Sequence, residues 1–249
     1  MSAEFDGLTA LVTGGGSGIG LAAASLLTDR GARVAALDLD PSDAPASVVR
    51  LTGDVGDFHS VSAGVAQAVQ ELGRLDILVN NAGIGAAGTV EDNSEEEWHR
   101  VFDVNVLGMM RVTRCALPHL RESPHAAIVN TCSIAATAGL PQRALYSATK
   151  GAVLALTRAM AVDHIGEGIR VNCVNPGTAD TPWVRRLLEA AGDPDAERAA
   201  LEARQPLGRL VSAEEVAHAI VALASPLAAS TTGTAFEVDG GMAGLRLPS

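Results

Sequence analysis

The sequence predicts an α/β fold, a doubly wound parallel sheet with helices on both faces. Short runs of Val, Leu, Ile and Ala recur along the chain, separated by longer amphipathic stretches. The runs lack the polar alternation of a half-exposed strand, so both faces of the sheet should be covered. Their alternation with helical patterns favours parallel strands joined by helical crossovers. No repeat or linker divides the 249 residues, so we predict a single domain over 1–249.

The first predicted unit is a strand, a glycine-rich turn and a helix. Residues 9–13 form an apolar run of strand length, and apolar residues then recur at helical spacing over 19–27. Helical patterns separate most of the later strands, which are predicted at 33–38, 48–52, 76–80, 127–131 and 170–175. The stretch 217–236 has the pattern of a helix end, a loop and a strand.

The segment 181–209 departs from this alternation. It is charged, helical in pattern, and inserted between the sixth strand and the next helix. Ligands of open α/β sheets bind beyond the carboxyl ends of the strands. We therefore predict that 181–209 is a lid over the binding site.

The composition argues against several classes of function. A net charge of −11 opposes binding to nucleic acid or to an anionic membrane, because both need basic surfaces. Glu4 and Asp6 lie where a secretory signal would carry positive charge. Proline and hydroxyl residues interrupt the nearly uncharged stretch 217–236, which argues against a membrane span. We expect a cytoplasmic protein.

The cysteines and histidines suggest neither disulfides nor a metal site. The three cysteines are far apart and without metal-ligand spacing, which is typical of reduced thiols with packing roles: Cys115, Cys132 and Cys173. The six histidines are scattered, with no ligand-spaced pair. We therefore predict no metal cofactor.

A glycine-rich turn joins the first strand to the first helix. It runs Thr13-Gly14-Gly15-Gly16-Ser17-Gly18-Ile19-Gly20. Glycines let the backbone approach a pyrophosphate, and the start of the helix supplies unpaired amides. The spacing differs from Gly-x-Gly-x-x-Gly, but the position between strand and helix favours a phosphate cradle over a merely flexible turn.

An acidic residue ends the second strand. Asp38 lies 18 residues after Gly20, where a carboxylate can accept hydrogen bonds from ribose hydroxyls and would repel a 2′-phosphate. This favours NAD over NADP. Asp40 is an alternative for the same role, and a solvated acid at the strand end is the alternative function for Asp38.

Tyr146 is the only tyrosine of the chain and Lys150 its only lysine, four residues apart in a helical segment. Residues i and i+4 share a helix face, so the ammonium can lie near the phenol. A nearby cation stabilises a phenolate, and such a pair is suited to general acid/base catalysis. An ordinary surface pair would be served by arginine, which the rest of the chain uses throughout.

Together these patterns resemble the short-chain dehydrogenase/reductase family over residues 8–241. The motifs that carry the resemblance are Thr13 to Gly20, Asp54-Val55, Asn80-Asn81-Ala82-Gly83, Asn105, Ser133, Tyr146-x-x-x-Lys150 and Pro176-Gly177. The resemblance implies a Rossmann-type fold, NAD as the cofactor and hydride transfer between nicotinamide and a secondary alcohol or ketone. It also implies a homotetramer.

The resemblance further implies a catalytic tetrad of Asn105, Ser133, Tyr146 and Lys150. Ser133 would hold the substrate oxygen, and Tyr146 would exchange the proton. Lys150 would assist Tyr146 and bind the nicotinamide ribose, while Asn105 would support a water relay to Lys150. Taken alone, Ser133 and Asn105 could equally be capping or core hydrogen-bonding residues.

The same resemblance gives a set of cofactor contacts along the strand ends. Asp54 and Val55 would bind the adenine, and Pro176, Gly177 and Thr178 would face the nicotinamide. The full set is Gly14, Ser17, Gly18, Ile19, Gly20, Asp38, Asp54, Val55, Asn81, Ala82, Gly83, Tyr146, Lys150, Pro176, Gly177, Thr178 and Thr181.

Arginines near Tyr146 and in the predicted lid indicate an anionic substrate. Arg143 precedes Tyr146 by three residues, and arginine binds carboxylates in a bidentate fork. The chain resembles the subgroup of 3-hydroxybutyrate-type and 2-keto-3-deoxy-sugar-acid dehydrogenases, whose carboxylate-binding arginines fall on Arg143 and Arg204. A third falls on Leu187, so we expect Arg186 to replace it or the substrate to differ.

Trp183 could wall the substrate or simply pack. The lid arginines could instead pair with lid acids, namely Glu189, Asp193, Asp195, Glu197 and Glu202. Two other functions stay open: reduction of carrier-bound 3-oxoacyl groups, and a catalytically idle dinucleotide-binding scaffold. Asp38 argues against the first, and the intact tetrad against the second.

Overall fold

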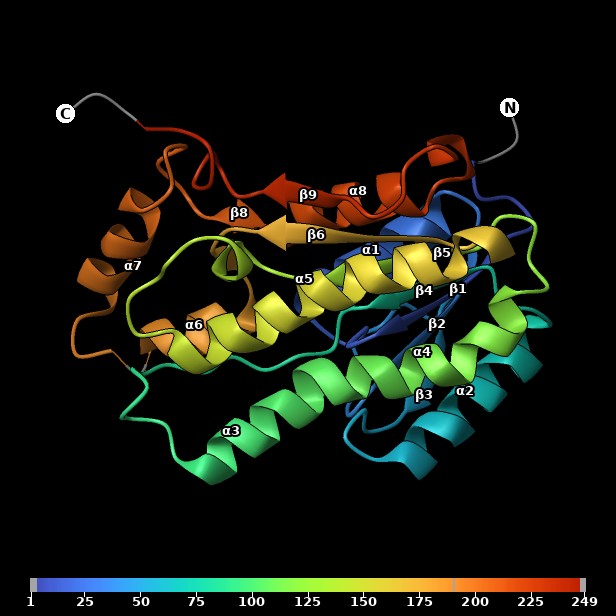
Figure 1. Cartoon of the computed structure of the whole chain (residues 1–249), viewed down its shortest axis with the longest axis horizontal. Helices are drawn as coiled ribbons and strands as arrows, with labels where there is room; N and C mark the ends of the chain where they lie inside the picture. The colour runs from blue at the N-terminus through green and yellow to red at the C-terminus, as the bar shows by residue number, and fades with distance from the viewer. Residues whose placement is uncertain (1–3, 190, 247–249) are drawn as a thin grey trace.

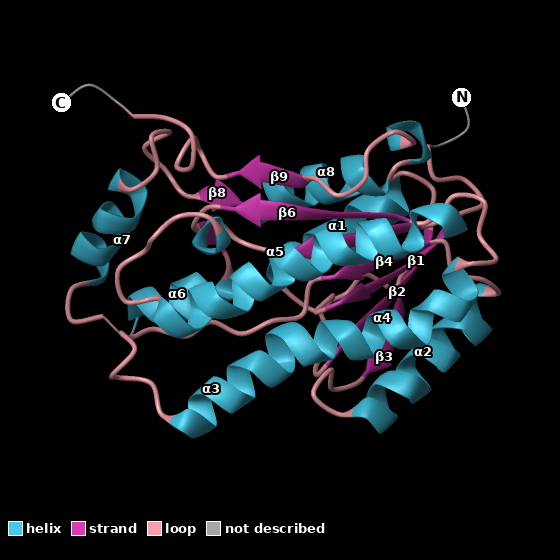
Figure 2. Ribbon diagram, viewed as in Figure 1, coloured by secondary structure: helices cyan, strands magenta, loops and turns pink. Residues whose placement is uncertain are grey.

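A seven-stranded parallel sheet lies between two layers of helices in the computed structural model of the chain (Figures 1 and 2). The structure describes residues 4–189 and 191–246. Residues 1–3 and 247–249 of the predicted domain, and residue 190 of the predicted lid, lie outside the described residues. The fold predicted from the sequence is confirmed.

The strands follow the order β3-β2-β1-β4-β5-β6-β9, and every neighbouring pair is parallel. Their bounds are β1 Thr9–Thr13, β2 Arg33–Asp38, β3 Val49–Thr52, β4 Ile77–Asn80, β5 Ala127–Thr131, β6 Arg170–Pro176 and β9 Ala235–Val238. The order reverses between β1 and β4. At such a switch point the connections leave in opposite directions and open a crevice at the carboxyl ends of the strands.

The predicted strands differ from the observed ones only at their ends and in two short additions. The third and fourth begin one residue later than predicted, and the sixth extends to Pro176. The pair β7 Ala179–Asp180 and β8 Val211–Ser212 was not predicted, because two residues carry no detectable periodicity.

Eight α-helices connect the strands within the described residues. They are α1 Gly18–Asp29, α2 Phe58–Leu72, α3 Glu95–Phe102, α4 Gly108–Leu120, α5 Ala144–His164, α6 Pro182–Glu189, α7 Pro194–Ala203 and α8 Ala213–Ala224. A π-helical turn, Asp103–Leu107, joins α3 to α4. Ser212 and Glu215 form a reciprocal capping box at the start of α8. None of the helices described is long and apolar enough to cross a membrane.

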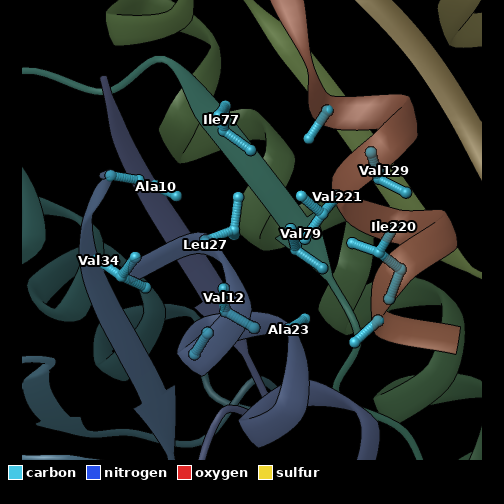
Figure 3. Packing of buried hydrophobic residues seen from close by; sticks show 14 of the residues in the cluster. Ala10, Val12, Ala23, Leu27, Val34, Ile77, Val79, Val129, Ile220 and Val221 are labelled. Carbon is cyan, nitrogen blue, oxygen red and sulfur yellow. The ribbon is translucent and has the colours of Figure 1, made fainter. Parts of the chain in front are cut away.

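Two apolar cores hold the layers together. On one face, α1 and α8 pack through Leu27 and Ile220 against Val12 and Val79 of the sheet (Figure 3). On the other face, α2, α4 and α5 cover the alternate side chains of the same strands, such as Leu78. Because both faces are buried, the strands contain few polar residues, as their sequence predicted.

The segment predicted as a lid forms α6 and α7 beyond the carboxyl ends of the strands. In Figure 1 the arrowheads of β6 and β9 point toward the side where these helices lie. The helices share a small apolar cluster of their own, made of Val184, Leu188, Leu201 and Leu210. This cluster is separate from the two large cores, so the segment is built as an attached unit above the sheet.

Candidate active site

Two adjoining hollows open at the carboxyl edge of the sheet. The first, here called the groove, runs from Asp38 and Asp54 past the glycine-rich turn to Lys150. The second, here called the pocket, lies between the end of β5 and the lid and contains Ser133, Arg143 and Arg204. Five residues line both hollows and mark their junction: Ile19, Thr131, Tyr146, Thr181 and Trp183.

The glycine-rich turn forms the floor of the groove. Gly14 and Gly18 have φ of +65° and +52°, a region that favours glycine. A Cβ on Gly20 would lie 2.0 Å from the carbonyl oxygen of Gly14. No side chain can therefore replace Gly20, because the first turn of α1 is packed directly against the loop.

The carboxylate of Asp38 is fixed at one end of the groove. Its Oδ2 accepts a hydrogen bond from the Gly16 amide at 2.8 Å, and its Oδ1 accepts one from the Asp40 amide at 3.2 Å. Asp38 lines the groove, whereas the Asp40 side chain is exposed and is not among the lining residues. Of the two candidate acids, only Asp38 is placed to meet a ligand in the groove.

Tyr146 and Lys150 lie one turn apart on α5. The Lys150 Nζ is 5.6 Å from the centre of the Tyr146 ring and donates a hydrogen bond to the Thr131 carbonyl at 2.8 Å. Lys150 is buried and makes no ion pair with any acid of the described residues. The ammonium of Lys150 and the ring of Tyr146 therefore lie side by side where the groove meets the pocket.

Ser133 follows the end of β5 and lines the pocket beside Tyr146. Its Oγ accepts a hydrogen bond from the Ala135 amide at 3.1 Å and caps the short helix that follows. The cap fixes the side chain while leaving its hydroxyl able to donate.

Asn105 lies in the π-helical turn and lines neither hollow. Its side chain exchanges hydrogen bonds with the backbone of Ile84 at 2.8 and 2.9 Å and donates to Thr149 at 3.1 Å. Thr149 in turn donates to the Tyr146 carbonyl. The side chain of Asn105 thus ties the loop that follows β4 to α5. No pattern in the sequence indicated the π-helical turn.

Two arginines line the pocket: Arg143, directly before α5, and Arg204, directly after α7 in the lid. Burial lowers the pKa of Arg143, and the positive charge of Arg204 lowers it further. Neither arginine makes an ion pair with another described residue. No Asp or Glu is among the residues that line this pocket, although the charge of Glu197 is near enough to raise the pKa of Arg143. Two guanidinium groups at one pocket could together hold an anion.

The placement of Arg186 differs from the prediction. Arg186 lines the groove, whereas Leu187 lines the pocket. Successive residues of a helix point about 100° apart, so Arg186 does not replace a pocket residue at 187. Among the lid residues that the structure describes, the predicted pairing of lid arginines with lid acids is seen only for Arg198 and Glu202. Arg185 pairs with Asp180 instead, at 3.0 Å.

The other predicted cofactor residues divide between the hollows. Pro176, Gly177 and Thr178 line the pocket, and Gly20 lines neither hollow. The remaining residues of the predicted set line the groove: Gly14, Ser17, Gly18, Ile19, Asp38, Asp54, Val55, Asn81, Ala82, Gly83, Tyr146, Lys150 and Thr181.

Sequence reasoning missed one residue of the pocket wall and anticipated another, Trp183, as a possible wall of the substrate site. Cys132, assigned to packing, also lines the pocket, and a hydrogen bond from Cys173 lowers the pKa of its thiol. Its place next to Ser133 at a strand end could have indicated this. Trp183 leaves no space for a side chain on Gly85, where a Cβ would lie 2.1 Å from its ring. The indole is therefore a partition between the two hollows.

The groove fits an extended dinucleotide. Asp38 offers acceptors for a ribose, the glycine-rich turn permits close approach of phosphates, and Lys150 offers a cation at the far end. The inner pocket then lies beyond the junction, where Tyr146 and Ser133 would meet a second, smaller ligand.

Comparisons with known proteins agree with this arrangement. Residues 14–243 match the family model described as enoyl-(acyl carrier protein) reductase. The chain is 41% identical over 242 residues to 2-(S)-hydroxypropyl-CoM dehydrogenase 3 of Xanthobacter autotrophicus, covering 93% of this chain and 94% of that protein. It is 41% identical over 251 residues to cis-4-hydroxycyclohexanecarboxylate dehydrogenase of Sinomonas cyclohexanicum, covering 97% and 98%.

A solved structure is also similar. The 3-ketoacyl-(acyl-carrier-protein) reductase of Brucella melitensis, complexed with NADH, superimposes with a TM-score of 0.88 at 33% identity, covering 96% of this chain and 99% of that one. The chain therefore belongs to the short-chain dehydrogenase/reductase family, oxidoreductases that act on CH–OH groups with a nicotinamide dinucleotide.

Proposed function

We propose that the protein is an NAD-dependent dehydrogenase of a small hydroxy acid or sugar acid. The observation that carries the proposal is the junction of the two hollows, where Tyr146 faces both the groove and the arginine-lined pocket. A cofactor in the groove and an anionic alcohol in the pocket would meet at this side chain.

In this proposal the nicotinamide supplies the hydride acceptor, and the side chains handle the proton and the orientation of the substrate. Tyr146 accepts the proton of the substrate hydroxyl, and Ser133 hydrogen-bonds the same oxygen. Lys150 places a positive charge 5.6 Å from the centre of the Tyr146 ring, and because it lines the groove it would bind the nicotinamide ribose. Asn105 acts as a support, because its hydrogen bonds hold Thr149 and thereby the start of α5.

The preference for NAD rests on the environment of Asp38. The carboxylate is held by two backbone amides, so it cannot turn away from a phosphate on the ribose. The two arginines of the groove, Arg100 and Arg186, belong to α3 and α6 and not to the loop after β2. A 2′-phosphate would therefore meet a fixed negative charge.

The carboxylate preference rests on Arg143 and Arg204. Paired guanidinium groups hold a carboxylate and so orient the rest of the molecule. The name of the Sinomonas relative, which acts on a hydroxycyclohexanecarboxylate, is consistent with such a substrate. We propose membership of the 3-hydroxybutyrate-type and 2-keto-3-deoxy-sugar-acid subgroup, with Leu187 and not an arginine at one wall of the pocket.

Reduction of a carrier-bound 3-oxoacyl group is the second candidate. The description of the family model and the Brucella structure, an acyl-carrier-protein reductase, favour it. It would require the arginines to face a phosphopantetheine-linked substrate, and Asp38 disfavours the NADPH that such reductases usually take. An idle scaffold is the third reading, and the complete set of four tetrad side chains argues against it.

A panel of substrates separates these functions. Hydroxy acids, sugar acids and matched neutral secondary alcohols are supplied with NAD or NADP, and a 3-oxoacyl carrier thioester is supplied with NADH or NADPH. The reduced cofactor is followed by absorbance in every case. We expect the highest kcat/KM for a hydroxy acid with NAD. A neutral alcohol preferred over every acid would remove the carboxylate proposal, and activity only with a 3-oxoacyl carrier thioester would favour the second candidate.

The homotetramer, implied by the family resemblance, and the cytoplasmic location, expected from the composition and the N-terminal residues, both stay predictions. Phe236 on the edge strand β9 and Val162 on α5 are 50% and 74% exposed, which is consistent with association of copies through these elements. Light scattering coupled to size-exclusion chromatography measures the mass of the assembly directly.

A further inference from the structure

Two neighbouring arginines of α6 have different surroundings. Arg185 is bound to Asp180 at 3.0 Å. Arg186 is exposed, lines the groove, and makes no ion pair within residues 4–189 and 191–246. Arg185 therefore ties α6 to the residues just before it, whereas Arg186 presents its positive charge to the groove.

The helix that carries Arg186 begins against the glycine-rich turn. Pro182 Cδ and Thr181 Cγ2 lie 3.5 and 3.6 Å from the position of a Cβ on Gly18. Pro182 and Arg186 are four residues apart and share one face of α6, and both line the groove. The guanidinium is thus on the face of the lid that overhangs the turn.

The charged residues of the groove are segregated. The acids that line it are Asp38, at the end of β2, and Asp54, after β3. The cations that line it are Lys150, Arg100 and Arg186. A dinucleotide bound in the groove would complement these charges. Its neutral ribose hydroxyls would lie near the acids, and its anionic pyrophosphate would lie at the glycine-rich turn. Arginine recognises phosphate oxygens through two parallel hydrogen bonds.

We propose that Arg186 binds the pyrophosphate of the cofactor, so that the start of the lid closes on the cofactor and not on the substrate. This inference rests on the proposed cofactor groove. Because Trp183 belongs to the same helix and forms the partition, cofactor binding also completes the wall of the inner pocket.

Ligands that carry or lack the pyrophosphate test the contact without turnover. Affinities of NADH, ADP-ribose and adenosine are measured on the cofactor-free enzyme, by fluorescence and by displacement of NADH. Arg186→Gln should weaken NADH and ADP-ribose by about 3- to 20-fold, the range of an exposed charge-assisted hydrogen bond, and leave adenosine unchanged. Arg186→Lys should restore part of the loss, and Arg185→Gln is the matched control.

Hydrogen exchange supplies an independent readout of the lid. ADP-ribose should protect the backbone amides of α6 in the wild type and in Arg185→Gln, and protect them less in Arg186→Gln at a concentration that saturates each variant. Equal affinities for ADP-ribose in the wild type and Arg186→Gln would overturn the proposal. The proposal would also be overturned if the only defect of Arg186→Gln were a higher KM for the acid substrate, because that result would mean that Arg186 binds the substrate.

Failure of the groove itself gives a different result. If Asp38→Ser and Arg186→Gln both leave dinucleotide affinity unchanged, the cofactor does not occupy the groove. If Asp38→Ser weakens adenosine and ADP-ribose while Arg186→Gln weakens neither, the groove stands and the role of Arg186 is wrong.

Discussion

The groove and the pocket are built by different means, although they share a wall. The groove consists of strand ends and tight turns seated on the two large cores, and its polar groups are held by backbone hydrogen bonds. The pocket has one wall of this kind and another made by α6 and α7, which rest on the four-residue cluster of the lid. The groove, built on the large cores, suits a cofactor that all members of a family share. The lid side of the pocket suits the substrate, which differs between members.

The two pocket arginines illustrate the contrast. Arg143 lies at the start of α5, where Gln142, with φ of 57°, accepts a hydrogen bond from the Gly88 amide at 3.0 Å. Gly88 in turn accepts one from the Ala144 amide. Arg204 follows α7 in the lid. A substrate anion held by both would therefore connect the lid to the rigid framework.

The largest effect should come from the residue shared by both regions. We expect Tyr146→Phe to reduce kcat by about 10³- to 10⁴-fold, because the ring still packs but cannot exchange a proton. NADH affinity, followed by fluorescence, should change little. Substantial turnover by this variant would show that another group carries the proton.

Cavities made in the two regions should differ in their effect on stability. Leu78 is a β4 residue whose side chain lies in the core covered by α2, α4 and α5. Leu78→Ala should lower the free energy of unfolding by about 2 to 5 kcal/mol. Leu201→Ala, in the lid cluster, should cost less than about 1 kcal/mol of global stability, because the lid can open locally. Urea denaturation measures both values. Equal losses would mean that the lid unfolds only together with the sheet.

The anion receptor is tested by a ratio of activities. Arg143→Ala or Arg204→Ala should lower kcat/KM for the acid substrate roughly 30- to 1000-fold, which corresponds to about 2 to 4 kcal/mol. The kcat/KM for neutral alcohols should be nearly unaffected. Arginine-to-lysine changes should restore only part, since an ammonium lacks the planar fork. If acid and neutral substrates lose equally, the arginines serve the folding of the lid.

The smallest effect is expected at the end of the groove. Asp38→Ser should lower the ratio of NAD to NADP efficiency by about 10- to 50-fold, because it removes the fixed charge that repels a 2′-phosphate. The Asp40→Ser variant is the matched control, as its side chain is exposed outside the groove. An unchanged ratio in Asp38→Ser would contradict the NAD assignment.

Local patterns in the sequence were sufficient to predict the sheet, the glycine-rich turn and the proximity of Tyr146 to Lys150. These features depend on periodicity or on spacing within one element, and three predicted strands agree with the structure at both ends. The sequence favoured Asp38 over Asp40 because Asp38 ends the second strand, and in the structure Asp38 lines the groove whereas the side chain of Asp40 is exposed.

Only the tertiary structure decided where the lid arginines point. Arg185, Arg186 and Leu187 are consecutive, yet they face Asp180, the groove and the pocket in turn. That outcome depends on the rotation of α6, which is set by the contact of Pro182 with the glycine-rich turn and by the burial of Val184 and Leu188. Both constraints join residues distant in the chain, so the spacing of the arginines could not reveal which ligand each would meet.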